Sequence, residues 1–72
     1  MRVELLRTQQ ATHVLDGQSY ILIAGTKGDV ESTLDGMTLK VTMDSAIKPL
    51  AGAVEMANQP FGISANDLKN IE

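Results

Sequence analysis

Apolar and polar side chains alternate strictly between residues 37 and 43. One face carries Met37, Leu39, Val41 and Met43, and the other carries Thr38, Lys40 and Thr42. A period of two residues is typical of a β-strand with one buried and one exposed face. We therefore predict a strand here that is covered on one side.

The dipeptide Asp-Gly occurs twice between strand-like segments, at Asp16-Gly17 and Asp35-Gly36. Asp-Gly is favoured in two-residue type I′ turns, because both turn residues need a positive φ. The pattern predicts two hairpins. One joins residues 12–15 to 18–24, and the other joins residues 30–34 to 37–43.

The segment 20–24 is apolar on both of its faces. Ile21 and Ile23 lie on one face, and Tyr20 and Leu22 lie on the other. An N-terminal strand over residues 2–7, in which Val3 and Leu5 face the same side, would complete a meander of four or five strands.

From Ser45 the apolar period becomes helical. Ile47, Leu50, Val54, Ala57 and Phe61 follow at spacings of three and four, which predicts a helix over residues 47–58 with one apolar stripe. Its start relative to Pro49 stays open, since proline is tolerated only in the first turn. Pro60 is expected to end it.

The C-terminus carries the signals of a second helix start. Ser64 suits the N-cap position and Asp67 the third helical position, while Ile63 and Leu68 are spaced as a hydrophobic staple. We predict a short capped helix over residues 65–71.

These elements predict an α+β fold: an antiparallel β-meander over residues 1–43, packed by a helical part over residues 44–72. A small β-barrel with a C-terminal helix is an alternative that the pattern does not separate from it. A chain of 72 residues beginning with Met1 is read as one complete domain.

Composition favours stabilisation by self-association. The chain has no Cys or Trp, one Tyr and one Phe, so it lacks disulfides, cysteine metal sites and most aromatic anchors, and a domain this small needs another support. The net charge of −3 shows neither a basic patch nor a dense acidic surface. With no secretory signal and no apolar run of membrane-spanning length, we expect a cytoplasmic protein without membrane contact.

Residues suited to catalysis or cofactor binding are few. In the sequence GTKGD the glycines Gly25 and Gly28 are too close for a phosphate-binding loop, and Lys27 is at most a weak anion contact. His13 is the only histidine, and nothing selects partners for it. Asp16 and Asp35 are explained by their turns. We predict no catalytic site, metal or cofactor.

A nucleic-acid-binding regulator is the alternative. Gly62, Ile63, Ser64, Leu68 and Ile71 match the turn and recognition helix of a helix-turn-helix motif. Asp67 and Glu72, however, would repel phosphate.

The preferred hypothesis is a small non-catalytic protein-binding module, an accessory or inhibitory protein of phage or mobile-element type that occupies a partner's surface. The partner or homodimer interface is predicted at Tyr20 and Leu22, whose face lacks a cover in the predicted meander, and at Met56 and Phe61. An enzyme with a site shared between subunits is the third hypothesis.

Overall fold

The structure, a computed structural model, describes residues 1–49 and 52–72. These residues form antiparallel β-strands and a single turn of 3-10 helix, and no α-helix occurs among them. The predicted α+β class is therefore wrong, and the fold is nearly all antiparallel β. The strands are β1 (Arg2–Leu5), β2 (Gln9–His13), β3 (Ser19–Leu22), β4 (Lys27–Asp35), β5 (Thr38–Lys48), β6 (Val54–Ser64) and β7 (Leu68–Asn70), with the 3-10 turn η1 (Ala65–Asp67).

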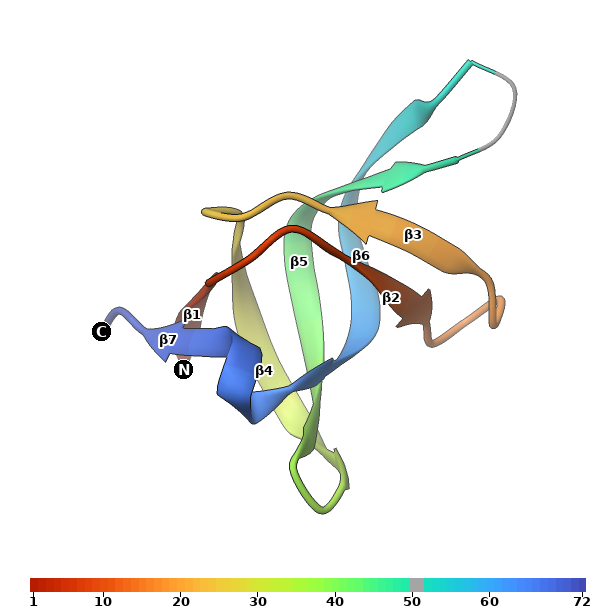
Figure 1. Cartoon of the computed structure of the whole chain (residues 1–72). Helices are drawn as coiled ribbons and strands as arrows, with labels where there is room; N and C mark the ends of the chain where they lie inside the picture. Colours follow the sequence, from red (N-terminus) through yellow and green to blue (C-terminus); the bar gives the residue numbers. More distant parts are fainter. Residues whose placement is uncertain (50–51) are drawn as a thin grey trace.

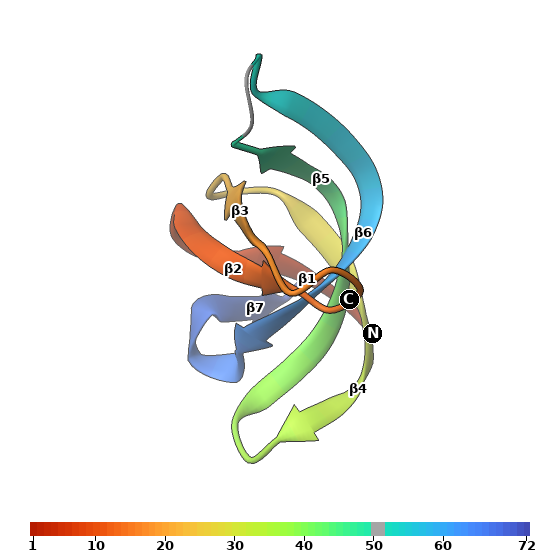
Figure 2. The same cartoon turned by 90° about the vertical axis from the view of Figure 1, so that its right-hand side faces the viewer.

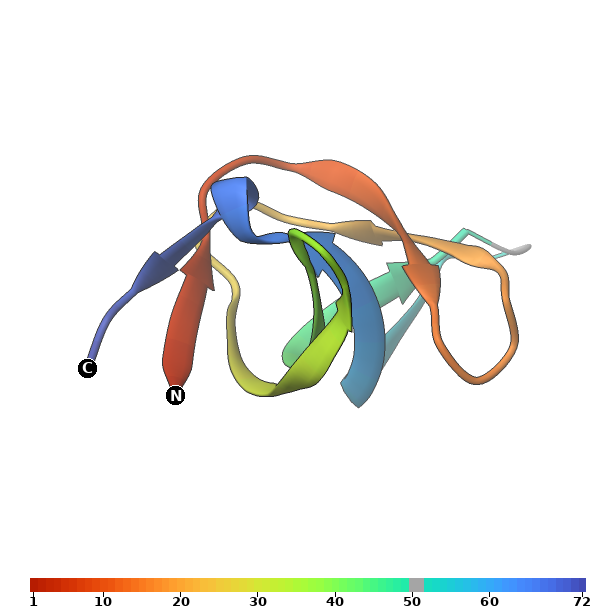
Figure 3. The ribbon, with the colours of Figure 1, turned by 90° about the horizontal axis from the view of Figure 1, so that it is seen from below.

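The strands follow the order β3-β2-β6-β5-β4-β1-β7 within one sheet. In addition, Ile21 in β3 pairs with Ile47 in β5, which closes β3, β2, β6 and β5 into a ring (Figure 1). Strands β4, β1 and β7 extend this ring at one side (Figure 3). The two termini lie close together, since the Ile71 amide donates to the Arg2 carbonyl.

The core lies inside the curled sheet and contains alternate residues of its strands. Val3 and Leu5 of β1 share a face, as predicted, and both are buried. The other buried apolar residues come from β2, β3, β5 and β6: Ala11, Tyr20, Leu22, Val41, Met43, Ala46, Phe61 and Ile63. Because side chains alternate across a strand, β1, β2, β3 and β6 each contribute one face to this core, whereas in β5 Ala46 is out of step with Val41 and Met43.

The helix predicted over residues 47–58 is absent. Strand β5 continues to Lys48 and β6 starts at Val54, with Lys48 opposite Val54. Part of the predicted helix, residues 50–51, lies outside the described residues. Gly52 and Ala53 both have positive φ, 97° and 44°, and turn the chain back. Of the apolar positions that mimicked a helical stripe, Phe61 is buried and Ile47 is half-buried, whereas Val54 and Ala57 are exposed. What shapes this segment is the pairing of β5 with β6 over almost their full length, which no local pattern shows.

The predicted terminal helix is reduced to the single turn η1. Ser64 caps it as expected, accepting a hydrogen bond from the Asn66 amide. At Leu68 the backbone becomes extended, with φ −122° and ψ 144°, and Leu68 pairs with Leu5 of β1. Residues 68–70 therefore pair with the free edge of β1 as strand β7 and do not continue as a second helical turn.

Both predicted hairpins exist, but their turns differ from the prediction. Val30 pairs with Val41, as expected, but the chain reverses at Gly36 and Met37 because β4 contains two irregularities before the turn. Strands β2 and β3 pair with Thr12 opposite Ser19, so residues 14–18 form a longer connection than the predicted two-residue turn.

Two hairpins project from the ring in opposite directions. The β4–β5 hairpin and the β5–β6 hairpin lie at opposite ends of the molecule, and β6 curves strongly between them (Figure 2). Asn58, in the middle of β6, has φ 56°, a conformation that Asn tolerates better than most residues. We attribute the bend of β6 to this residue.

Candidate functional site

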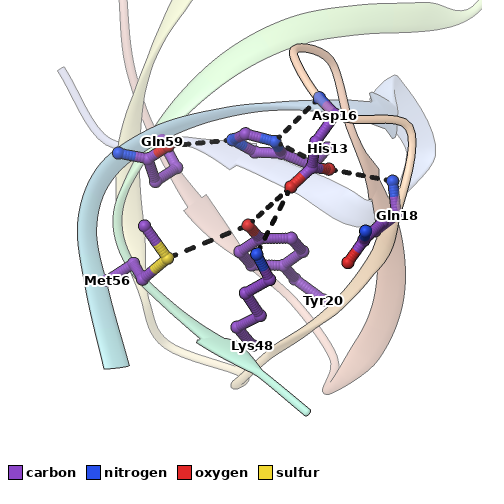
Figure 4. Close-up of polar contacts among 7 residues, drawn as sticks. All are labelled: His13, Asp16, Gln18, Tyr20, Lys48, Met56 and Gln59. Atoms are coloured by element: carbon purple, nitrogen blue, oxygen red, sulfur yellow. Dashed lines mark hydrogen bonds and ion pairs between the residues drawn. The ribbon is translucent and has the colours of Figure 1, made fainter. Parts of the chain in front are cut away.

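The main cluster of ionisable side chains surrounds Asp16 (Figure 4). His13 ends β2, Asp16 lies in the β2–β3 connection, Tyr20 is in β3 and Lys48 is near the end of β5. Met56 and Gln59 of β6 complete the cluster. It joins residues of the β2–β3 hairpin to β5 and β6, where the ring closes.

His13 is 4% exposed, and both of its ring nitrogens have partners. Nε2 lies 2.8 Å from Oε1 of Gln59, and the Gln59 amide group donates to the Ala57 carbonyl. Oε1 therefore accepts, so Nε2 carries the proton. Nδ1 accepts from the Asp16 amide at 3.2 Å and lies 3.0 Å from Oδ1 of Asp16, to which a protonated ring would donate.

The pKa of Asp16 lies below its ordinary value, mainly because the Gln18 amide donates to its carboxylate and further because the Tyr20 hydroxyl does so, although desolvation opposes these effects. The Tyr20 hydroxyl donates to Oδ2 of Asp16 at 2.9 Å. Burial raises the pKa of Tyr20, and the Asp16 carboxylate raises it further. The cluster thus favours an ionised Asp16 beside a neutral phenol.

Lys48 and three aromatic rings pack around the contact between Asp16 and Tyr20. Nζ of Lys48 lies 3.8 Å from Oδ2 of Asp16 and 5.7 Å from the centre of the Tyr20 ring. The rings of His13 and Tyr20 stack at 4.7 Å, and both meet Phe61 edge-on. Such contacts add specific geometry to apolar burial.

The chemistry open to this cluster is limited by access. In residues 1–49 and 52–72 no pocket was found, and no buried side-chain nitrogen or oxygen lacks a hydrogen-bond partner. His13 and Tyr20 therefore use their polar atoms within the fold. We assign the cluster a structural role: it fastens the β2–β3 connection to β5 and β6.

The sequence prediction did not find this cluster. Asp16 was explained by its turn alone, and His13 was given no partner. The spacing His13-x-x-Asp16-x-x-x-Tyr20 was a usable signal, since a short loop returns the second strand beside the first. Lys48 and Gln59 could not be found this way, because they lie far away in sequence.

The residues predicted as an interface occupy different places. Tyr20, Leu22 and Phe61 are at most 1% exposed and belong to the core, so the face thought to lack a cover is covered by the chain itself. Met56 is half-buried, and its sulfur lies 3.8 Å from the Tyr20 hydroxyl.

Lys27, the weak anion candidate, is exposed at the start of β4, opposite Glu4 of β1. This carboxylate makes anion binding at Lys27 less favourable. Gly25 forms the preceding turn with φ 90°, in agreement with the prediction that this segment is a turn.

A second charged group lies on the outer surface of β1, β4 and β5. Arg2 donates to Asp29 at 3.1 Å and to Asp44 at 3.0 Å. These carboxylates raise the pKa of Arg2, and the hydrogen bond to Asp44 is the largest cause. All three side chains are partly exposed. In the part of the chain that the structure covers, no group of three or more His, Asp or Glu residues is placed to hold a metal ion.

In comparisons with known proteins, no protein-family model, curated protein or solved structure was found to match this chain. Within the described ranges, no helix has the length and apolar character needed to cross a membrane.

Proposed function

We propose that this chain is a small non-catalytic binding protein that occupies a surface of a larger protein through the tip of its β4–β5 hairpin. One observation carries the proposal. Leu34, near the end of β4, and Met37, in the turn, are 48% and 58% exposed at the end of a projecting hairpin (Figure 1).

Apolar side chains at this tip add little to the chain's own stability. Residues 31–37 are all exposed, and the core is built without Leu34 or Met37. Hairpin turns favour small and polar residues. Isolated exposed apolar residues are ordinary on protein surfaces, but a pair on a projecting turn, where polar residues would serve the fold equally well, is typical of a contact site.

The charges beside the tip describe the surface that would receive it. Asp35 is exposed between the two apolar residues in sequence, and Glu31 is exposed further back along β4. A complementary partner therefore offers an apolar pocket with Lys or Arg at its rim. Burial of a Leu or Met side chain contributes about 1.5–3 kcal/mol before the costs of association.

Affinity capture with matched baits tests the proposal. Immobilised wild-type protein, the double variant Leu34→Glu/Met37→Glu and the control Leu15→Glu are compared in a lysate of the native host. Leu15 is 76% exposed in the β2–β3 connection, so its substitution adds the same charge on a different surface.

We expect a protein that is retained by the wild type and by the control but not by the double variant. With that protein purified, calorimetry should show an affinity at least about 10-fold weaker for the double variant. Equal affinities for the double variant and the wild type would refute the tip as the binding surface. Circular dichroism confirms that all three baits are folded.

The other hypotheses lose part of their basis. The nucleic-acid hypothesis depended on a recognition helix over residues 65–71, and the chain there forms one 3-10 turn and β7. Self-association through Tyr20 and Leu22 has no support, since both are buried. A shared-site enzyme, a cytoplasmic location and a phage or mobile-element origin stay predictions.

A further inference from the structure

The outer edge of β6 is open over residues 54–57. On its inner side β6 pairs with β5 through its whole length. On its outer side it pairs with β2 only at Phe61 and Gly62, with one further bond from the Val14 amide to the Pro60 carbonyl. In the described part of the chain no strand pairs with residues 54–57 on this side, and the Ala57 carbonyl accepts a hydrogen bond from the Gln59 side chain.

The other long free edge, the outer half of β4, is protected against pairing. β4 pairs with β1 only over residues 27–29, and beyond them it has two register shifts against β5. It also carries the charges of Glu31 and Asp35. Bulges and charges are the usual means of blocking edge-to-edge association.

The edge of β6 has fewer of these protective features, although Asn58, with φ 56°, bends the strand just beyond it. Four consecutive pairs, from Lys48 opposite Val54 to Ser45 opposite Ala57, run without a shift. Residues 54–57 contain neither proline nor lysine, and Glu55 is their only charge. Within this range, Val54 is 51% exposed. One edge is therefore blocked and the other is left ready for a strand.

We propose that a second copy of this chain pairs antiparallel with β6 at this edge, making a two-fold symmetric dimer with a sheet continuous through both copies. The two-fold axis must be perpendicular to the sheet, so equivalent faces of both copies lie on the same side. Residues directly opposite each other must then lie on the same face of the sheet, so their sequence numbers differ by an even number. The two-fold axis therefore passes beside one residue, which is opposite its own copy.

Two registers place the two-fold axis near the middle of residues 54–57, one centred at Glu55 and one at Met56, and charge distinguishes them. A centre at Glu55 would place this carboxylate opposite its own copy, which is unfavourable. A centre at Met56 places Met56 opposite Met56, and Glu55 opposite Ala57 of the second copy, twice. This register leaves no like charges opposed, and it brings two half-buried thioether side chains together, a contact for which methionine is well suited.

The size of this contact predicts a weak dimer. A standard interface buries about 800 Å² per partner, which is roughly a fifth of the 4128 Å² accessible surface of this chain. A short strand pair with the neighbouring Val14, which is 38% exposed, is smaller. We therefore expect a dissociation constant of the order of micromolar to hundreds of micromolar.

Two substitutions at one exposed position test both the surface and the register. Ala57→Glu places a new carboxylate opposite Glu55 of the second copy, whereas Ala57→Lys places an ammonium group there. We expect dimerisation about 2- to 30-fold weaker for Ala57→Glu and stronger by a similar factor for Ala57→Lys, since each pair occurs twice. Sedimentation equilibrium up to about 1 mM protein measures both.

The control is Thr33→Glu on the protected edge of β4, which should leave dimerisation unchanged. A reversed pair, Glu55→Lys/Ala57→Glu, should restore association. Hydrogen exchange in the wild type gives a readout without substitution: amides of residues 54–57 should become more protected as protein concentration rises. A wild type that stays monomeric at about 1 mM, or a dimer equally insensitive to both charges at Ala57, overturns the proposal. Neither result affects partner binding by the β4–β5 tip.

Discussion

Gly28 is the position where the fold leaves no room for a side chain. A Cβ atom added there would lie 2.7 Å from the Thr42 carbonyl oxygen, 2.8 Å from the Met43 sulfur and 3.0 Å from a methyl group of Val41. Gly28 pairs with Val3 on one side and with Met43 on the other, so β4 is held between two strands. We predict that Gly28→Ala forces β4 and β5 apart.

The magnitude follows from what blocks the new methyl group. The Met43 side chain can rotate away, but the Thr42 carbonyl is backbone within the β4–β5 ladder and cannot move without moving β5. Overpacking in a core costs about 1–3 kcal/mol, and a backbone obstacle favours the upper half of that range. At about 0.05–0.15 kcal/mol per residue, the whole chain has roughly 4–11 kcal/mol of stability.

Thermal and urea unfolding of Gly28→Ala and of a control, Gly62→Ala, measure this effect. A Cβ at Gly62 meets only the ends of the Leu34 and Thr38 side chains, at 3.3 and 3.5 Å. We expect Gly28→Ala to lower the Tm by roughly 8–20 °C, with a much smaller change for the control. Equal Tm values for the two variants would refute the reasoning.

Four further effects are expected. Asn58→Val should destabilise the fold by about 1–2 kcal/mol, because a β-branched residue avoids φ 56°, while Asn58→Gly should not; urea unfolding compares the two, and equal losses would exclude strain as the cause. Phe61→Ala should cost about 3–5 kcal/mol, because Phe61 is fully buried, so its urea midpoint should fall far below that of the control Leu15→Ala. The lowered pKa of Asp16 adds stability above its ordinary value of 3.8, which is lost as the pH falls below it. The raised pKa of Tyr20 adds stability that is complete below pH 10 and is lost as the pH rises further. When Tm is measured against pH, its fall at acid pH should be smaller in Asp16→Asn, and its fall at alkaline pH should be smaller in Tyr20→Phe. Profiles unchanged from the wild type would contradict both assignments.

The fold was predictable where a short pattern and a nearby partner act together. Val3 and Leu5 are buried as their alternation indicated, and Val30 pairs with Val41. The turn next to that pair was misplaced, since the irregularities in β4 have no sequence signal of their own. The Asp16 cluster was half visible: its His13 and Tyr20 lie near in sequence, while Lys48 does not.

The helix over residues 47–58 failed for a different reason. Spacings of three and four also occur by chance along two strands joined by a turn. Here β5 and β6 pair with each other from Thr38 opposite Ser64 to Lys48 opposite Val54. A helix would have left the long edge of β5 unpaired, and the gain from this ladder arises only when both strands are present.

By itself, the sequence determined only some local features: the alternation of buried residues in several strands, a chain reversal near each Asp-Gly pair, and the cap that Ser64 forms on the turn after it. The tertiary structure alone decided the closure of β3 onto β5, the burial of Tyr20 and Leu22 inside one chain, and the edge of β6 that is left open. The physical reason is that strand pairing joins backbone groups across long sequence separations. Which strand covers which face depends on all strands together, and no single segment contains that information.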